Sequence, residues 1–416
     1  GEIRDAGPLS PALSREGRGR NITGKHSHQG IQTMPFRPRY TGLIERYRDR
    51  LPIHDDTRII SLGEGNTPLI RLNNIPRLIG KEVDIYVKYE GLNPTGSFKD
   101  RGMTMAVTKA VEAGSRAIIC ASTGNTSAAA AAYAARAGIT AFVLIPEGKI
   151  AMGKLAQAMM HGSTVLQIRG NFDAGMQLVK EVAEQAPVTI VNSINPYRLQ
   201  GQKTAAFEIV EELGRAPDYH CLPVGNAGNV TAIMEVFLDL YRLSIIPQLP
   251  QIVAVQSRHA NPVASWHESG RYEPMKVSSS VAQAAMIGDP VSFPKVKKLV
   301  EEHFREQFFA VDLAEQEVIE GMLEANRRGH VVCTQGGESI AGLARAVKLG
   351  IVAKDRTVVV DSTSHQLKFS NFQQMYFENS FPPEYQITAK PELVNKPVQL
   401  EASADAIAGY LKLKEK

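Results

Sequence analysis

The stretch NPTGSFKDRGM, residues 93–103, places a single lysine between a turn of small residues and the start of an expected helix. Hydrogen-bonding side chains precede this lysine, and Phe98 supplies an aromatic ring directly beside Lys99. An isolated lysine at a helix start is ordinarily a solvated charge. The segments on either side of this stretch decide whether Lys99 is an exception.

Short apolar runs alternate with amphipathic segments along most of the chain. Strands are expected at residues 84–90, 117–122, 140–146, 164–170, 188–193, 219–225, 251–257 and 357–363. These runs are rich in β-branched residues and nearly continuous in apolar character, as strands covered on both faces are. Helical spacing of apolar residues predicts helices at 172–185 and 314–329. This alternation predicts an α/β protein with parallel sheets and right-handed crossovers.

The expected strands fall into two groups, which predict two open parallel-sheet domains, the smaller inserted in the larger. Four closely spaced strands predict the small mobile domain at 101–195, and the segments 34–100 and 196–416 predict the large domain. A ligand cleft is expected between the two.

The ends of the chain differ from its middle. Residues 1–33 are rich in Gly, Arg, Ser and Pro and lack the apolar core of a secretory signal. A disordered extension is the preferred interpretation over an organelle transit peptide. Residues 377–402 are expected to form an extended tail, followed by a short helix near 403–413.

Composition narrows the class of protein further. The chain has 416 residues, of which 43% are hydrophobic and 22% charged, with a net charge of +4. These values are typical of a soluble enzyme of two or three domains. No basic run with interleaved aromatic residues and no membrane-length apolar run is present, so neither nucleic acid nor membrane is an expected partner. Cys120, Cys221 and Cys333 show neither metal nor disulfide spacing, so no metal is expected and a reducing cytoplasm is the natural setting.

A loop of small residues follows the expected strand at 219–225. Gly225, Asn226, Ala227, Gly228 and Asn229 lead into an expected helix. Bare backbone N–H groups at the positive end of a helix form an anion site suited to a phosphate. An ordinary strand-to-helix turn is an equal alternative for this loop alone. The loop matches neither the dinucleotide fingerprint nor a P-loop, so the phosphate belongs to another ligand.

Two further polar loops follow strands. Ser122, Thr123, Asn125 and Thr126 precede an alanine-rich helix, and they exceed what N-capping alone needs, so they suit a substrate carboxylate. Thr363 ends the last expected strand, where a hydroxyl would meet a heterocycle nitrogen at the ligand-binding edge of the sheet. Generous capping and an ordinary polar loop are the alternatives.

Together the three loops change the interpretation of the lysine. A phosphate site, a carboxylate site and a partner for a ring nitrogen accompany one lysine whose pKa would be lowered by desolvation or a neighbouring cation. This combination fits pyridoxal phosphate held as a Schiff base on Lys99.

The motifs resemble those of the threonine synthases, in the tryptophan-synthase-β-like group of fold type II pyridoxal-phosphate enzymes. The resemblance covers about residues 60–370 and depends on the segments 63–69, 97–103, 122–126, 192–198 and 225–229. The family implies a carbon–oxygen lyase that converts O-phospho-L-homoserine and water to L-threonine and phosphate. It also implies a homodimer.

The resemblance also implies roles for individual residues. Lys99 would carry the cofactor and move protons. Phe98 would pack near the ring, and Asn125 would hydrogen-bond its phenolic oxygen. Gly225 through Asn229 would hold the phosphate, and Thr363 would meet the ring nitrogen.

The segment 192–203 is the expected binding site for the substrate phosphate. It supplies Asn192, Ser193, Asn195, Arg198 and Lys203. Arg198 is suited to clamp a phosphate through two hydrogen bonds. A loop with a solvated arginine is the alternative.

Two stretches depart from the family pattern, and they leave the substrate open. Residues 333–339 read CTQGGES where many members have E-P-A-S-A, and residues 363–368 read TSHQLK where many have T-G-H-G-L-K. A cysteate synthase acting on phosphoserine and sulfite is one alternative, and a serine/threonine dehydratase is another. A phosphate-sensing or scaffold protein that kept the fold is the non-enzymatic alternative.

Overall fold

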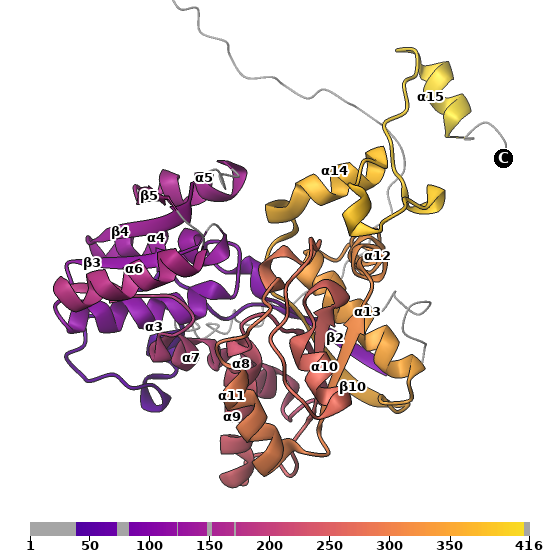
Figure 1. The fold of residues 1–416 in the computed structure, drawn as a ribbon. Helices are drawn as coiled ribbons and strands as arrows, with labels where there is room; N and C mark the ends of the chain where they lie inside the picture. The colour runs from indigo at the N-terminus through magenta and orange to yellow at the C-terminus, as the bar shows by residue number, and fades with distance from the viewer. Residues whose placement is uncertain (1–38, 73–82, 123, 148–151, 170–171, 412–416) are drawn as a thin grey trace, which may run out of the picture. The chain divides into compact units, whose positions relative to one another are not determined.

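The computed structural model describes residues 39–72, 83–122, 124–147, 152–169 and 172–411. Residues 1–33, and with them the expected N-terminal extension, lie outside the described residues. The described part contains two β-sheets, and Figure 1 shows the strands of both with helices beside them.

The larger sheet has six strands in the order β1-β2-β10-β7-β8-β9. Their bounds are Leu69–Arg71 (β1), Val83–Tyr89 (β2), Tyr219–Pro223 (β7), Gln251–Ser257 (β8), Phe308–Leu313 (β9) and Arg356–Ser362 (β10). All neighbouring pairs are parallel except β1 with β2. Val360 of β10 lies opposite Val87 on one side and Cys221 on the other.

The smaller sheet contains four parallel strands in the order β5-β4-β3-β6. Their bounds are Ala117–Ala121 (β3), Thr140–Pro146 (β4), Thr164–Ile168 (β5) and Val188–Ile190 (β6). The four strands expected between residues 117 and 193 therefore form one sheet, and the prediction of two parallel-sheet units is confirmed.

Helices connect most of the strands. Their bounds are Leu43–Arg46 (α1), Lys99–Glu112 (α3), Asn125–Ala137 (α4), Met152–Met160 (α5), Phe172–Gln185 (α6), Pro196–Gln202 (α7), Thr204–Leu213 (α8), Gly228–Arg242 (α9), Pro262–Ser269 (α10), Phe293–Leu299 (α11), Glu315–Asn326 (α12), Thr334–Lys348 (α13), Ser370–Glu378 (α14) and Ala404–Tyr410 (α15). The helix predicted at 172–185 is present with those bounds. The helix predicted at 314–329 ends at Asn326 and continues as a turn to Gly329, whose φ is +84°.

The central strands of the larger sheet are buried on both faces. Along β7, Cys221 packs in a cluster with Ile340 of α13, and the next residue, Leu222, packs in a second cluster with Phe237 of α9. Successive strand residues point to opposite faces, so α13 and α9 cover opposite faces of this sheet. Burial of each large aliphatic side chain stabilises the fold by about 1.5–3 kcal/mol. These strands are apolar along their length because helices cover both of their faces.

The strands β1 and β9 lie at the edges of the larger sheet and were not expected from the sequence. β1 has three residues, of which only Leu69 is buried, and three of the six residues of β9 are only partly buried. The segment expected as a tail at 377–402 begins with the last two residues of α14 and otherwise contains only short 3₁₀ turns; Leu393 within it packs into the core cluster that includes α13.

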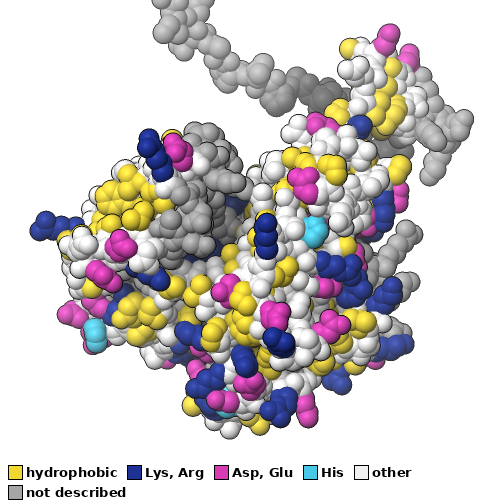
Figure 2. Space-filling view, in the orientation of Figure 1, with side chains coloured by type: hydrophobic (Ala, Val, Ile, Leu, Met, Phe, Trp, Pro, Cys, Tyr) yellow, Lys and Arg dark blue, Asp and Glu magenta, His cyan; other side chains and the backbone are white. Residues whose placement is uncertain are grey.

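Charges are mixed on the surface. Figure 2 shows lysine and arginine side chains interspersed with carboxylates on the visible face. Within the described ranges, every helix is too short or too polar to cross a membrane.

Candidate active site

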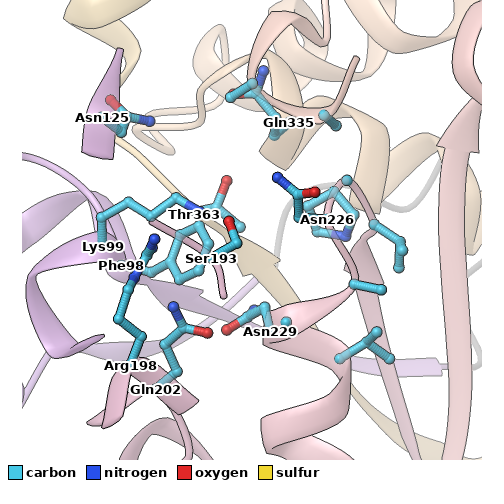
Figure 3. Close-up of a pocket in the computed structure, with 18 of the residues that line it drawn as sticks. Phe98, Lys99, Asn125, Ser193, Arg198, Gln202, Asn226, Asn229, Gln335 and Thr363 are labelled. Carbon is cyan, nitrogen blue, oxygen red and sulfur yellow. The ribbon is translucent and has the colours of Figure 1, made fainter. Parts of the chain in front are cut away.

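An inner cavity of about 60 Å³ lies where the ends of β7 and β10 meet the starts of α3 and α9. Figure 3 shows Lys99, Thr363 and Asn226 converging on it. Several predicted residues line this cavity: Phe98, Lys99, Asn125, Ser193, Arg198, Gly225, Asn226, Ala227, Gly228, Asn229 and Thr363. The structure thus brings together the lysine and the loops that the sequence singled out.

The loop from Gly225 to Asn229 presents backbone to the inner cavity. Ala227 has φ of +61°, in the left-handed region that non-glycine residues rarely adopt, and α9 begins at the next residue. A Cβ on Gly225 would lie 3.0 Å from the Cα of Ala285, which is tighter than ordinary contact. This loop therefore brings the N–H groups of the first turn of α9 toward the cavity, as an anion site requires.

A buried carboxylate forms a hydrogen bond with this loop. Asp361 of β10 is 2% exposed and accepts a hydrogen bond from the Asn229 amide, with 3.2 Å between Nδ2 and Oδ2. Its other oxygen lies 3.0 Å from Nε2 of His220, which is fully buried on β7. Asp361 thereby links two strands of the sheet to the anion loop.

Lys99 is the first residue of α3 and lines the inner cavity. Its Nζ lies 4.3 Å from the centre of the Phe98 ring. Burial lowers the pKa of Lys99 well below its usual value, and the nearby Arg198 guanidinium lowers it further. Both causes considered from the sequence, desolvation and a neighbouring cation, are present.

Backbone hydrogen bonds join the lysine segment to the end of β10. The Phe98 N–H donates to the Thr363 carbonyl at 2.9 Å, and the His365 N–H donates to the Gly96 carbonyl at 2.9 Å. Ser97 and Ser364 form an isolated bridge between these bonds. The hydroxyl of Thr363 is therefore held beside Lys99 although 264 positions separate the two residues in the sequence.

An ion cluster anchors α3 on the side away from the cavity. We define it as Lys88, Glu90, Arg101 and Glu208, all of which are buried. Arg101 pairs with Glu90 at 2.7 Å and with Glu208 at 2.6 Å, and Lys88 pairs with Glu208 at 2.8 Å. Burial opposes ionisation of Glu208, but Arg101 and Lys88 outweigh it and lower its pKa to about 2. No local sequence pattern predicts this cluster, because its members come from three separate segments.

A larger outer cavity, of about 280 Å³, adjoins the inner one. Lys99, Asn125, Ser193 and Asn226 line both. Its other polar side chains are those of Ser122, Thr126, Gln157, Asn192, Gln283 and Lys368. Among the described residues that line it, none is a carboxylate, so the outer cavity favours an anionic ligand.

Only some of the predicted substrate-binding residues line the outer cavity. Ser122, Thr126, Asn192 and Ser193 line the outer cavity, and Thr123 lies outside the described residues. Asn192 also pairs with both backbone groups of Ala121, at 3.0 and 2.9 Å.

The other three predicted substrate-binding residues, Asn195, Arg198 and Lys203, do not line the outer cavity. Asn195 caps α7 by accepting a hydrogen bond from the Tyr197 N–H, and Lys203 lines neither cavity. Arg198 is 2% exposed and lines the inner cavity, so the alternative of a solvated arginine is wrong.

Two residues with no predicted role also reach the cavities. Gln335, in one of the two stretches that depart from the family pattern, lines the inner cavity. Lys368, in the other, lines the outer cavity and donates a hydrogen bond to Oδ1 of Asn125 at 3.0 Å. No local sequence pattern marks the contact between Lys368 and Asn125, because these two residues are 243 positions apart.

The cavities fit a phosphorylated aldehyde cofactor. Within the described part of the chain, Arg198 Nε and Gln202 Oε1 are buried without a hydrogen-bond partner, and both residues line the inner cavity beside the glycine loop. A reactive amine, an anion loop and a hydroxyl at a strand end are the groups that such a cofactor needs. The arrangement defines the class of pyridoxal-phosphate-dependent enzymes.

Comparisons with known proteins agree. The sequence profile of the family described as "Pyridoxal-phosphate dependent enzyme" matches residues 60–363. The threonine synthase of Mycobacterium tuberculosis is 48% identical over 331 residues, which are 79% of this chain and 89% of that protein. The threonine synthase of Synechocystis is 54% identical over 257 residues, which are 62% of this chain and 66% of that protein. The structure of maize serine racemase superimposes with a TM-score of 0.65 at 20% identity, over 82% of this chain and 98% of that one, and shows the same fold. The chain therefore belongs to the pyridoxal-phosphate-dependent enzymes and, among them, to the threonine synthases.

Proposed function

We propose that the protein converts O-phospho-L-homoserine and water to L-threonine and phosphate. The observation that carries the proposal is the position of Lys99, which lines both an inner anion-binding cavity and an outer polar cavity. The inner cavity suits the cofactor phosphate, and the outer cavity suits a small substrate with two anionic groups. The curated threonine synthases at 48–54% identity support this assignment.

The cofactor supplies an electron sink that stabilises negative charge on the substrate carbon next to the amine. Its phosphate would lie on the loop from Gly225 to Asn229. Asn125 would donate to its phenolic oxygen, the Thr363 hydroxyl would meet its ring nitrogen, and Phe98 would pack near the ring. An uncharged partner at the ring nitrogen keeps that nitrogen largely unprotonated.

Lys99 is the proposed catalytic residue. Because its pKa is lowered, a larger fraction of its amine is unprotonated and able to accept the substrate α-proton. Loss of a β-proton would accompany cleavage of the bond between the γ-carbon and the phosphate oxygen, and the phosphate would leave with the bonding electrons. The same Nζ would return a proton to the γ-carbon and, at the end of the reaction, to the α-carbon. A water molecule then supplies the hydroxyl at the β-carbon.

The substrate anions would be bound from two sides. Ser122 and Thr126, at the start of α4, suit the carboxylate. Asn192 and Ser193 suit the phosphate, and Arg198, which lines the inner cavity beside Ser193, would add a positive charge next to them. Asn195 and Lys203 are outside this proposed set because they line neither cavity.

Phosphate release from O-phospho-L-homoserine, with threonine identified as the product, tests the proposal. We expect turnover by the wild type and none by Lys99→Ala, with Lys297→Met as an exposed lysine control. Turnover of phosphoserine with sulfite, or of serine and threonine alone, would identify the cysteate synthase or dehydratase alternative. A protein that stays colourless after addition of pyridoxal phosphate would favour the scaffold alternative.

We also propose that residues 101–195 form a mobile domain and that the protein is a cytoplasmic homodimer. All three cysteines are buried and free, which is consistent with a reducing compartment. Small-angle scattering should show closure when a phosphonate analogue of the substrate binds, and its absolute intensity should correspond to a dimer. An unchanged curve with a monomer mass would contradict both proposals.

A further inference from the structure

Lys368 lies at a position that the proposed chemistry does not use. It belongs to the 3₁₀ turn Gln366–Phe369, just past the end of β10, and lines the outer cavity. Its Nζ donates to Oδ1 of Asn125 at 3.0 Å. Asn125 is the first residue of α4, in the unit of the smaller sheet, so this hydrogen bond connects elements associated with the two sheets.

The Lys368 side chain passes over the turn that leads to Lys99. Gly96 in this turn has φ of +81°, and a Cβ there would lie 2.9 Å from Cε of Lys368, so the lysine side chain would have to shift. The Gly96 carbonyl accepts from the His365 N–H at 2.9 Å, and the His365 carbonyl accepts from the Lys368 N–H at 3.2 Å. The amine of Lys368 is therefore placed by the same backbone that places the reactive lysine.

This contact determines which way the Asn125 amide faces. A side-chain amide has an oxygen that accepts and a nitrogen that donates. When the oxygen accepts from Lys368, the nitrogen must face the other way, and Figure 3 shows the nitrogen of Asn125 directed toward the cavity. Without a partner for the oxygen, rotation by half a turn would present the oxygen to the cavity instead.

We propose that Lys368 is a positioning residue that holds the Asn125 amide with its N–H toward the phenolic oxygen of the cofactor. This inference rests on the cofactor-binding role of Asn125 in the proposed function. In this proposal Lys368 acts through Asn125, to which it donates a hydrogen bond.

The charge state of Lys368 adds a second readout. Burial lowers the pKa of Lys368 to about 8, while Asp100 and Cys333, which face it, oppose this shift. Lys99 shares the cavity and Arg198 lies beside Lys99. Protonated Lys368 can only donate, whereas neutral Lys368 can also accept from the amide nitrogen. The amide orientation is therefore fixed below pH about 8 and is less constrained above it.

A double-mutant cycle on cofactor binding, without substrate, tests the proposal. Pyridoxal phosphate affinity and the absorbance of the bound cofactor would be measured for wild type, Lys368→Met, Asn125→Ala and the double variant. We expect Lys368→Met to weaken affinity about fivefold, the usual effect of one hydrogen bond. The double variant should be no weaker than Asn125→Ala alone. Lys368→Arg should restore most of the affinity, and Lys297→Met should match wild type.

Two further readouts separate positioning from a structural effect. The wild-type affinity should fall as the pH rises through about 8, and this fall should disappear in Asn125→Ala. Equal losses from Lys368→Met in both backgrounds would overturn the proposal, since Lys368 would then act independently of Asn125. Unchanged affinity and absorbance in a folded Lys368→Met protein would also overturn it. Because no substrate is used, failure here is distinct from failure to release phosphate from O-phospho-L-homoserine.

Discussion

The pocket around Lys99 and the ion cluster around Arg101 begin at cations two residues apart on α3. Arg101 is enclosed by Glu90 and Glu208, and these carboxylates outweigh the effect of burial and raise its pKa further above its usual value. For Lys99, burial is the larger cause of the lowered pKa, and the neighbouring Arg198 lowers it further. Because both cations are buried, the charge of their partners distinguishes the structural anchor from the reactive amine.

The largest effect should follow from breaking the cluster. Arg101→Met removes one side of the buried ion cluster and leaves Glu90 without its guanidinium partner, so the free energy of unfolding should fall by about 3–5 kcal/mol. Urea denaturation of the apoenzyme would measure this change. Arg46→Met, which removes an exposed pair with Glu211, should cost less than about 1 kcal/mol. Equal effects of the two changes would contradict the role of burial in the cluster.

The next effect concerns the reactive amine itself. Arg198→Met removes the cation beside Lys99, so the pKa of Lys99 should rise toward its usual value. A smaller fraction of the amine would then be unprotonated at neutral pH, and apoenzyme should combine with pyridoxal phosphate more slowly. The pH dependence of this rate should shift to higher pH. Lys203→Met, on the adjacent turn but outside both cavities, is the matched control and should leave the profile unchanged.

The sequence predicted the parts of this comparison that depend on local pattern. Continuous apolar strands and the glycine loop at 225–229 are local signals, and both were located correctly. The ion cluster and the contact between Lys368 and Asn125 join segments more than 100 residues apart, so no local pattern reports them. Arg198 illustrates the same limit, because its residue type suggested a phosphate ligand but not its burial beside Lys99. The edge strand β9 was missed because partial exposure breaks its apolar run.

A smaller effect should follow from loosening the support of the anion loop. Asp361→Asn removes the charge that accepts from Asn229 and faces His220, so the affinity for pyridoxal phosphate should weaken about fivefold. Equilibrium titration of apoenzyme with the cofactor would measure it. Asp312→Asn, at a partly exposed pair with Arg258 on the edge strand, should leave the affinity unchanged. Wild-type affinity in Asp361→Asn would mean that the backbone of the loop is sufficient alone.

The covalent position of the cofactor tests the central claim most directly. Holoenzyme would be reduced with borohydride, digested, and mapped by peptide mass spectrometry. Lys99 should carry the whole label, because its amine is placed at both cavities and has the lowered pKa. A label on Lys368, the other described lysine of the outer cavity, or on any other residue, or no label at all, would contradict the account.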